Sequence, residues 1–99
     1  MDRYIVISPH TAANCIDVLM DVMQSGYVTH FEWGCRDGDH TGYVIIDASD
    51  RHEALMVVPS LYRADARAVK LNTYSPEEIV TMHKAATKRR QEAAGSSGE

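Results

Sequence analysis

An Asp37-Gly38 dipeptide separates two segments that are rich in β-branched and aromatic residues, 28–35 and 40–48. Asp-Gly is favoured in a two-residue turn of type I′, because both central residues of that turn need a positive φ angle. The sequence therefore predicts a β-hairpin over residues 28–48. Because successive side chains of a strand point to opposite faces, the hairpin also determines which residues share a face of the sheet.

One strand pattern and one helix pattern precede the hairpin. The β-branched run 4–7 is soon followed by a proline, which cannot donate a hydrogen bond to a neighbouring strand. Residues 12–23 carry apolar side chains at helical spacing. We expect this helix to face the core with Ile16, Leu19 and Met23.

Another strand and two further helices are predicted after the hairpin. Asp50 can cap a short helix that Pro59 interrupts, and alternation over 66–72 predicts the fourth strand. The run Ser-Pro-Glu-Glu at 75–78 is typical of a helix start, because serine caps, proline fits the first helical position and acids favour the N-terminal end of the helix dipole. A third helix is therefore expected from about residue 76.

The predicted order, β-α-β-β-α-β and a final helix, is that of a ferredoxin-like α+β domain. In that fold the antiparallel sheet has the strand order 4-1-3-2 and carries its helices on one face. Ninety-nine residues are near the lower end of the size at which one hydrophobic core is stable alone. We assign residues 1–91, including the C-terminal helix, to a single domain and 92–99 to a flexible tail.

Several polar residues are predicted to share the sheet face that the helices leave open. With Asp-Gly at the centre of the turn, cross-strand partners have residue numbers that sum to 75, which places Glu32 opposite Tyr43. The same face carries His30, Glu32, Tyr43 and Asp47, with Ile45 among them. These four are the candidate catalytic residues, because together they could form a general acid/base pocket. The sequence favours the simpler alternative, in which they only hydrogen-bond across a subunit interface.

The run HTGYVIIDA at 40–48, followed by a helix from Arg51 and a fourth strand, resembles the dimeric α+β barrel superfamily. This superfamily includes muconolactone isomerases and antibiotic-biosynthesis monooxygenases. The resemblance covers roughly residues 1–83. It implies a homodimer whose two sheets pack face to face and enclose pockets for small, often aromatic or hydrophobic ligands. It is a resemblance of pattern, and no catalytic residue of the superfamily maps onto a numbered position here.

Three potential metal ligands are predicted to meet at one end of the sheet. The strand order places the end of the first strand beside the start of the third, so His10, Cys35 and His40 converge. Imidazole and thiolate are the ligands that zinc and related metals prefer, and an aspartate, Asp37 or Asp39, or water could complete the site. Two alternatives stay open, a surface histidine pair beside a semi-buried cysteine and thiol or acid-base chemistry at the mouth of a pocket.

Two arginines are candidate ligand-binding residues. Arg63 and Arg67 lie near the start of the fourth strand, at the same end of the sheet as His10. An arginine can bind a carboxylate through two parallel hydrogen bonds, so these residues could hold an acidic ligand. The alternative is that they are solvated or form an ion pair with Asp65.

The composition limits the classes of partner and compartment. The formal net charge is -4 and the pI is near 5.7, so no general electrostatic footprint for nucleic acid or an anionic membrane is present. No apolar run approaches the roughly 20 residues that cross a bilayer. We expect a cytoplasmic protein in which both cysteines, Cys15 and Cys35, are free thiols.

The sequence thus leads to one main hypothesis and two alternatives, and it leaves open whether the protein is an enzyme. The main hypothesis is a small-molecule-binding homodimer of the α+β barrel type, with isomerase-like or monooxygenase-like chemistry. The first alternative is a non-catalytic interaction or accessory subunit whose open sheet face is entirely an interface. The second is a metal-binding protein that holds a transition metal such as zinc.

Overall fold

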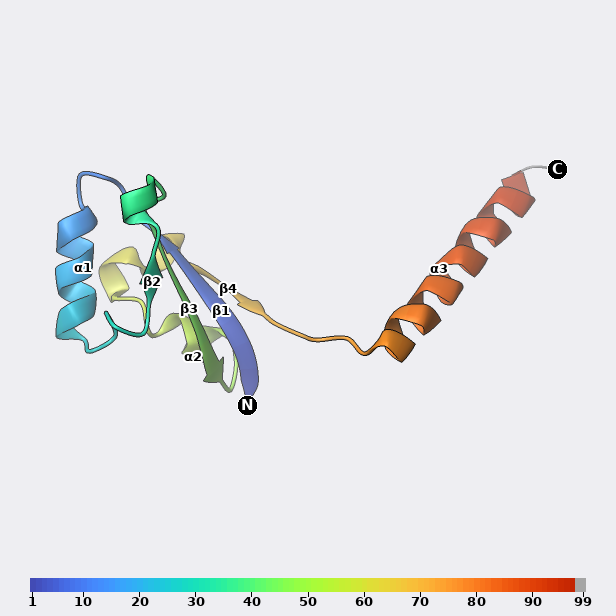
Figure 1. Ribbon diagram of the computed structural model, residues 1–99, viewed down its shortest axis with the longest axis horizontal. Coiled ribbons are helices and arrows are strands. Elements are labelled where there is room, and N and C mark those ends of the chain that lie inside the picture. The colour runs from blue at the N-terminus through green and yellow to red at the C-terminus, as the bar shows by residue number, and fades with distance from the viewer. Residues whose placement is uncertain (98–99) are drawn as a thin grey trace.

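The computed structural model describes residues 1–97 and contains one four-stranded antiparallel sheet with helices, which confirms the α+β class (Figure 1). The strands are β1 (Asp2–Pro9), β2 (Glu32–Trp33), β3 (Thr41–Ala48) and β4 (Arg67–Lys70). The helices are α1 (Cys15–Gln24), η1 (Cys35–Asp37), α2 (Arg51–Leu55), η2 (Ser60–Asp65) and α3 (Pro76–Ser97). The strand order is β2-β3-β1-β4, which reads β4-β1-β3-β2 from the opposite edge.

The sheet is built on β1, which pairs with β3 along its whole length and with β4 on its other side. The alternation of β1 is strict: Tyr4 and Val6 are buried on the helix side, whereas Ile5 and Ile7 are only half-buried on the other. The core cluster comprises Tyr4, Val6, Val18, Val22, Phe31, Val44, Ala48, Ala54, Val57, Val58 and Ala68. The helices therefore cover one face of the sheet, and the other face is open.

Helix α1 faces the core with a different stripe from the one expected. Cys15, Val18 and Val22 are its buried residues, whereas Ile16 is 72% and Met23 51% exposed. Both stripes have helical spacing, and they differ by about one residue, or 100°, around the helix axis. The smaller side chains face the sheet, and Cys15 thereby faces the end of β1.

The connection between β2 and β3 is longer than the predicted two-residue turn. The expected register is confirmed, since Glu32 pairs with Tyr43 and Trp33 with Gly42. However, β2 has only two residues, and η1 occupies the loop after it. The chain then turns at Gly38, whose φ of 85° needs a residue without a Cβ atom. Within the paired part, a Cβ on Gly42 would lie 2.7 Å from the Trp33 ring, as expected for a ring lying over a glycine.

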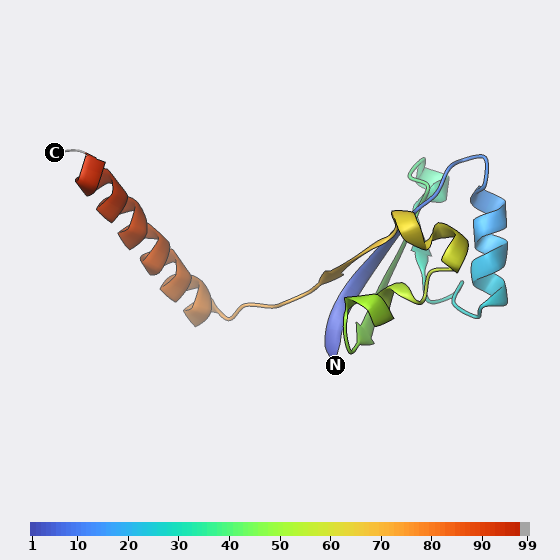
Figure 2. The same ribbon diagram turned by 180° about the vertical axis from the view of Figure 1, so that it is seen from behind.

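Helix α3 begins at the predicted position and stands away from the sheet in both views (Figures 1 and 2). The N-terminus of α3 has the expected cap, because the Ser75 hydroxyl accepts from the Glu78 amide and the Glu78 carboxylate accepts from the Ser75 amide. The molecule is consequently elongated, with extents of 63 × 29 × 23 Å. The predicted tail, 92–99, is helical up to Ser97, and its last two residues lie outside the described part of the chain.

Candidate metal centre

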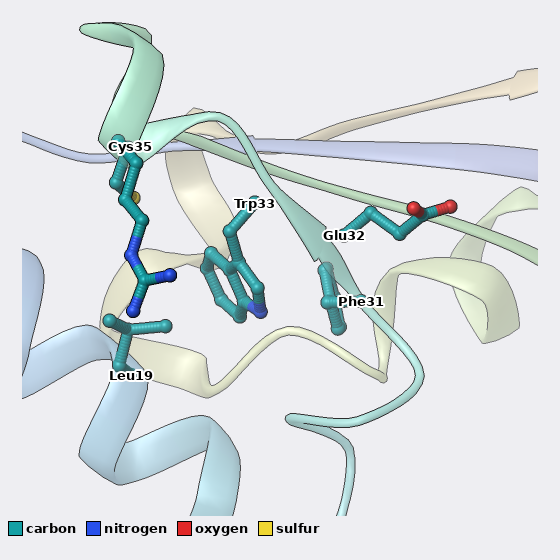
Figure 3. Close-up of a pocket in the computed structure, with 6 residues that line it drawn as sticks. Leu19, Phe31, Glu32, Trp33 and Cys35 are labelled. Atoms are coloured by element: carbon teal, nitrogen blue, oxygen red, sulfur yellow. The ribbon is translucent and has the colours of Figure 1, made fainter.

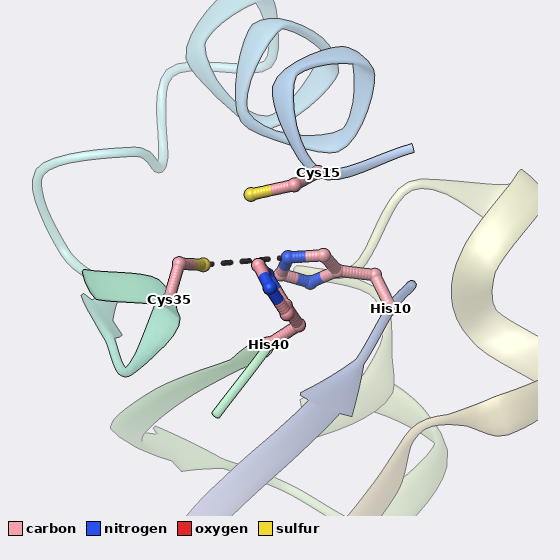
Figure 4. A group of neighbouring side chains, drawn as sticks. All are labelled: His10, Cys15, Cys35 and His40. Carbon is pink, nitrogen blue, oxygen red and sulfur yellow. Dashed lines mark hydrogen bonds between the residues drawn. The ribbon is translucent and has the colours of Figure 1, made fainter. Parts of the chain in front are cut away.

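Four side chains from separate parts of the sequence meet beyond one end of the sheet (Figure 4). His10 follows β1, Cys15 opens α1, Cys35 opens η1 and His40 precedes β3. The backbone fixes the two histidines relative to each other, since the His10 amide donates to the His40 carbonyl at 2.9 Å. The three residues predicted from the sequence are therefore brought together, and Cys15 joins them.

The distances within this cluster are short enough for the four side chains to hold one metal ion. One ligand atom from each residue can be chosen so that all four lie within 4.8 Å of one another. The His10 Nε2 and Cys35 Sγ atoms are 3.4 Å apart. Zinc bonds of about 2.3 Å to sulfur and 2.0–2.1 Å to nitrogen place such ligands about 3.5 Å apart in a tetrahedral site. The cluster therefore needs only small side-chain movements to surround one ion.

The surroundings of the two imidazoles leave part of their hydrogen-bonding capacity unused. Across residues 1–97, the Nδ1 atoms of both His10 and His40 are buried and have no hydrogen-bond partner. The two rings contact each other edge to face, with centroids 5.5 Å apart. A buried polar atom without a partner is uncommon and calls for an explanation such as an ion. His10 can offer only one of its two ring nitrogens to a single ion, so its ligand atom would be either Nε2, which lies beside Cys35, or the unpartnered Nδ1.

The local electrostatics shift the pKa values of His10 and Cys35 in the metal-free cluster. Burial lowers the pKa of His10, and the neighbouring His40 lowers it further. Burial raises the pKa of the Cys35 thiol, and its hydrogen bond with Cys15 raises it further. A dication would reverse the pKa shift at the Cys35 sulfur, because it stabilises thiolate strongly.

Neither aspartate that could have provided the fourth ligand, Asp37 or Asp39, belongs to the cluster. Asp39 instead accepts hydrogen bonds from the hydroxyls of Thr41, at 2.6 Å, and Tyr43. These two bonds hold the pKa of Asp39 below its usual value, and the bond to Asp39 raises the pKa of Tyr43. Asp37 lies at the exposed end of η1.

Cys15 is the member of this cluster that the sequence interpretation did not include, although a spacing signal is present. Four residues separate His10 from Cys15, and four separate Cys35 from His40, in the reverse order of residue types. Cys15 belongs both to this mirrored pattern, H-x4-C and C-x4-H, and to the apolar pattern of the helix. Its position in the first turn of α1 brings its sulfur to the end of the sheet.

A hollow of about 480 Å³ adjoins the cluster at Cys35 (Figure 3). Leu19, Phe31 and Trp33 give it apolar walls, and Glu32 and Arg36 are also part of its lining. The Trp33 indole donates to the Val28 carbonyl at 3.3 Å, which fixes the ring that separates the hollow from the core. The hollow shares one residue with the cluster and is otherwise distinct from it.

The open sheet face carries most of the predicted catalytic residues. His30, Glu32 and Tyr43 line a second hollow, of about 380 Å³, together with apolar residues that include Ile5 and Ile45. Asp47 is not part of this lining; it lies farther along β3, opposite Arg3. Three of the four predicted residues are thus near one another.

The two predicted ligand-binding arginines have different surroundings. Arg63 donates from Nε and Nη2 to the Val58 carbonyl, at 3.0 and 2.7 Å, so it holds the chain between α2 and η2. Arg67 is exposed on the open face, where it pairs with Ile7 across β1 and β4.

No helix within the described residues is long and apolar enough to cross a membrane. No protein-family model, no curated protein and no solved structure matches this chain.

Proposed function

We propose that this protein binds one zinc ion through His10, Cys15, Cys35 and His40. The observation that carries the proposal is the convergence of four ligand atoms within 4.8 Å of one another, from two imidazoles and two thiols. Two histidines and two cysteines form a well-known ligand set of tetrahedral zinc sites. Softer ligands of this kind select zinc over magnesium or calcium, which prefer oxygen.

The proposed site is structural. Four protein ligands fill a tetrahedral shell and leave no position for a substrate. The ligands connect α1 and η1 to the ends of β1 and β3, so the ion would join segments that otherwise meet through few contacts. Zinc would thereby stabilise the helix layer on the sheet.

Elemental analysis of protein purified without chelator or affinity metal tests the proposal. We expect one zinc per chain, and Cys15→Ser should reduce the zinc content to well below one tenth because it removes a ligand. Asp37→Asn is the matched control, since Asp37 is an alternative fourth ligand from the same loop. Full zinc in Cys15→Ser would contradict the proposal, and loss of zinc in Asp37→Asn would contradict the assignment of Cys15.

We further propose that the domain is ferredoxin-like and forms a homodimer through its open sheet face. The strand order read from β4 supports the fold. Ile45 on this face is 50% and Val69 37% exposed, and they flank Ile5 in one row across the sheet. Such a row gains free energy when a second apolar surface covers it. Two facing sheets would also enclose the hollow that His30, Glu32 and Tyr43 line. These polar side chains suit a small organic ligand.

The charges on the open face are self-complementary. One row across the sheet runs Glu32, Tyr43, Ile7, Arg67, with an acid at the β2 edge and a base at the β4 edge. When two copies of the sheet pack face to face about a two-fold axis parallel to the strands, the strand order of one copy runs opposite to that of the other. Each row of one copy then lies over the same row of the second copy. Glu32 would then face the second copy's Arg67. Two rows farther along the same face, beyond the row of Ile5, Asp47 would face the second copy's Arg3 in the same way.

Light scattering at micromolar concentration should give twice the 11.0 kDa mass of the chain. Glu32→Arg should weaken the dimer by at least about tenfold, because it places two arginines opposite each other at both ends of the row. The charge reversal Glu32→Arg with Arg67→Glu should restore it. A monomeric parent protein would contradict the proposal, and a dimer that is insensitive to Glu32→Arg would place the interface elsewhere.

A further inference from the structure

An exposed apolar patch covers the outer side of α1. The α1 patch consists of Ile16, Leu19, Met20 and Met23, and with Val28 it lines a groove of about 280 Å³. Ile16, Met20 and Met23 are 72%, 48% and 51% exposed. Large apolar side chains gathered in this way usually mark an interaction site, and methionine adapts easily to a partner.

Helix α3 carries a second exposed apolar surface. The α3 stripe consists of Ile79, Met82 and Ala86, which recur at helical spacing and line one shallow hollow together with Arg89 and Arg90. Ile79 and Met82 are 49% and 50% exposed, and α3 stands away from its own sheet (Figures 1 and 2). Helices in proteins owe most of their stability to packing of such a stripe, so a surface that covers the α3 stripe would stabilise the helix.

The α1 patch and the α3 stripe match in length and in charge. Each runs over eight residues, or about 10 Å of helix. Helix α1 contains no basic residue, and Asp17 lies at the side of the patch, one residue after Ile16. Asp21 lies farther round the helix and accepts a hydrogen bond from the Tyr62 hydroxyl. Arg89 and Arg90 lie beside the α3 stripe. Packing the two surfaces together would therefore bring opposite charges to the rim of the contact.

We propose that the α3 stripe of one chain packs against the α1 patch of a second copy. This inference rests on the proposed pairing of the open sheet faces, which brings the β4 edge of one copy beside the β2 edge of the other. Helix α1 lies beside β2 (Figure 1). Residues 71–75, which connect β4 to α3, can extend over about 17 Å. To reach the α1 patch of the second copy, α3 therefore needs only to pass that copy's β2 edge. To reach the α1 patch of its own chain, it would have to cross the width of the sheet and pass α2.

Photo-crosslinking of the full chain tests the contact. p-Benzoylphenylalanine in place of Ile79 should give a product of twice the chain mass on a denaturing gel, crosslinked to the peptide that contains Ile16 and Met20. The same photo-reactive residue in place of Lys88 is the matched control, because nine residues place Lys88 on the opposite side of α3. Met20→Asp should reduce the Ile79 product at least fivefold while light scattering still gives the dimer mass.

The outcomes separate this inference from the dimer on which it depends. A dimer by light scattering with the expected crosslink supports both. A dimer whose crosslink stays within one chain, joins two α3 helices or is missing overturns the α3 contact and leaves the sheet pairing intact. A monomer by light scattering overturns both proposals.

Discussion

Removal of zinc from the native protein by a chelator is expected to lower its melting temperature by about 15–30 °C. An ion that binds only the folded chain stabilises it by about 4 kcal/mol when free zinc exceeds the dissociation constant about a thousandfold. For a domain of this size, 1 kcal/mol corresponds to about 4–8 °C. The effect should be large because the ion joins His10 and His40 at the sheet to Cys15 on α1, and such ligands are not preformed in the unfolded chain.

Thermal unfolding followed by circular dichroism, with and without chelator, measures this shift. Cys15→Ser provides the control: it should melt near the chelated parent protein, and chelator should change its melting temperature by less than about 3 °C, since ~0.5 kcal/mol or less then depends on metal. Equal melting temperatures for the parent protein in zinc and in chelator would show that no stabilising ion is bound, whatever the elemental analysis finds.

The sequence predicted correctly those parts of the structure in which a local pattern of residues is compatible with only one arrangement of the backbone. The pairing of Glu32 with Tyr43 follows from strand alternation and the position of the turn, and a shift by one residue would turn every side chain of β2 to the other face. Likewise, the cap of α3 depends on Ser75 and Glu78 alone. Neither prediction needs information from distant residues.

The face of α1 could not be predicted in this way. Ile16, Leu19 and Met23 form as regular a stripe as Cys15, Val18 and Val22, and the larger side chains gain more from burial. The structure buries the second stripe, which leaves the larger residues at the surface. A distant interaction accompanies this choice, because burial of the second stripe places Cys15 beside His10 and His40 at the end of the sheet.

The hairpin loop shows a similar limit. Asp37-Gly38 is a strong turn signal, yet the structure uses only Gly38 in a left-handed conformation, after η1. The loop closes through backbone hydrogen bonds from the Asp39 amide to Gly34 and from the Gly34 amide to Thr41. Within this longer loop Cys35 opens η1, and its Sγ atom lies 3.4 Å from the His10 Nε2 atom. The loop that carries Cys35 is therefore part of the candidate metal site. The Asp37-Gly38 dipeptide by itself predicts only that the chain turns here.

The pH dependence of stability is expected to differ between the metal-free and the zinc-bound protein, most clearly above pH 9. In the metal-free protein the pKa of His10 is lowered from 6.5, chiefly by burial, so the unfolded chain binds this proton more readily and stability falls as the pH drops through 6.5. The pKa of Cys35 is raised from 9.0, so the folded chain keeps its thiol proton longer, and stability falls again as the pH rises through 9.0.

Bound zinc should remove the loss of stability at alkaline pH and should make the loss of stability at acid pH steeper. A ligated sulfur is already thiolate, so raising the pH releases no further proton from Cys35 when the zinc-bound chain is folded. On the acid side, two thiol protons compete with the ion, and zinc affinity should fall about 100-fold per pH unit below the ordinary thiol pKa. Urea unfolding at pH 5.5, 7.5 and 10, with zinc and with chelator, measures both branches. An alkaline loss of the same size in both samples would mean that Cys35 keeps its proton in the presence of zinc and is not a ligand.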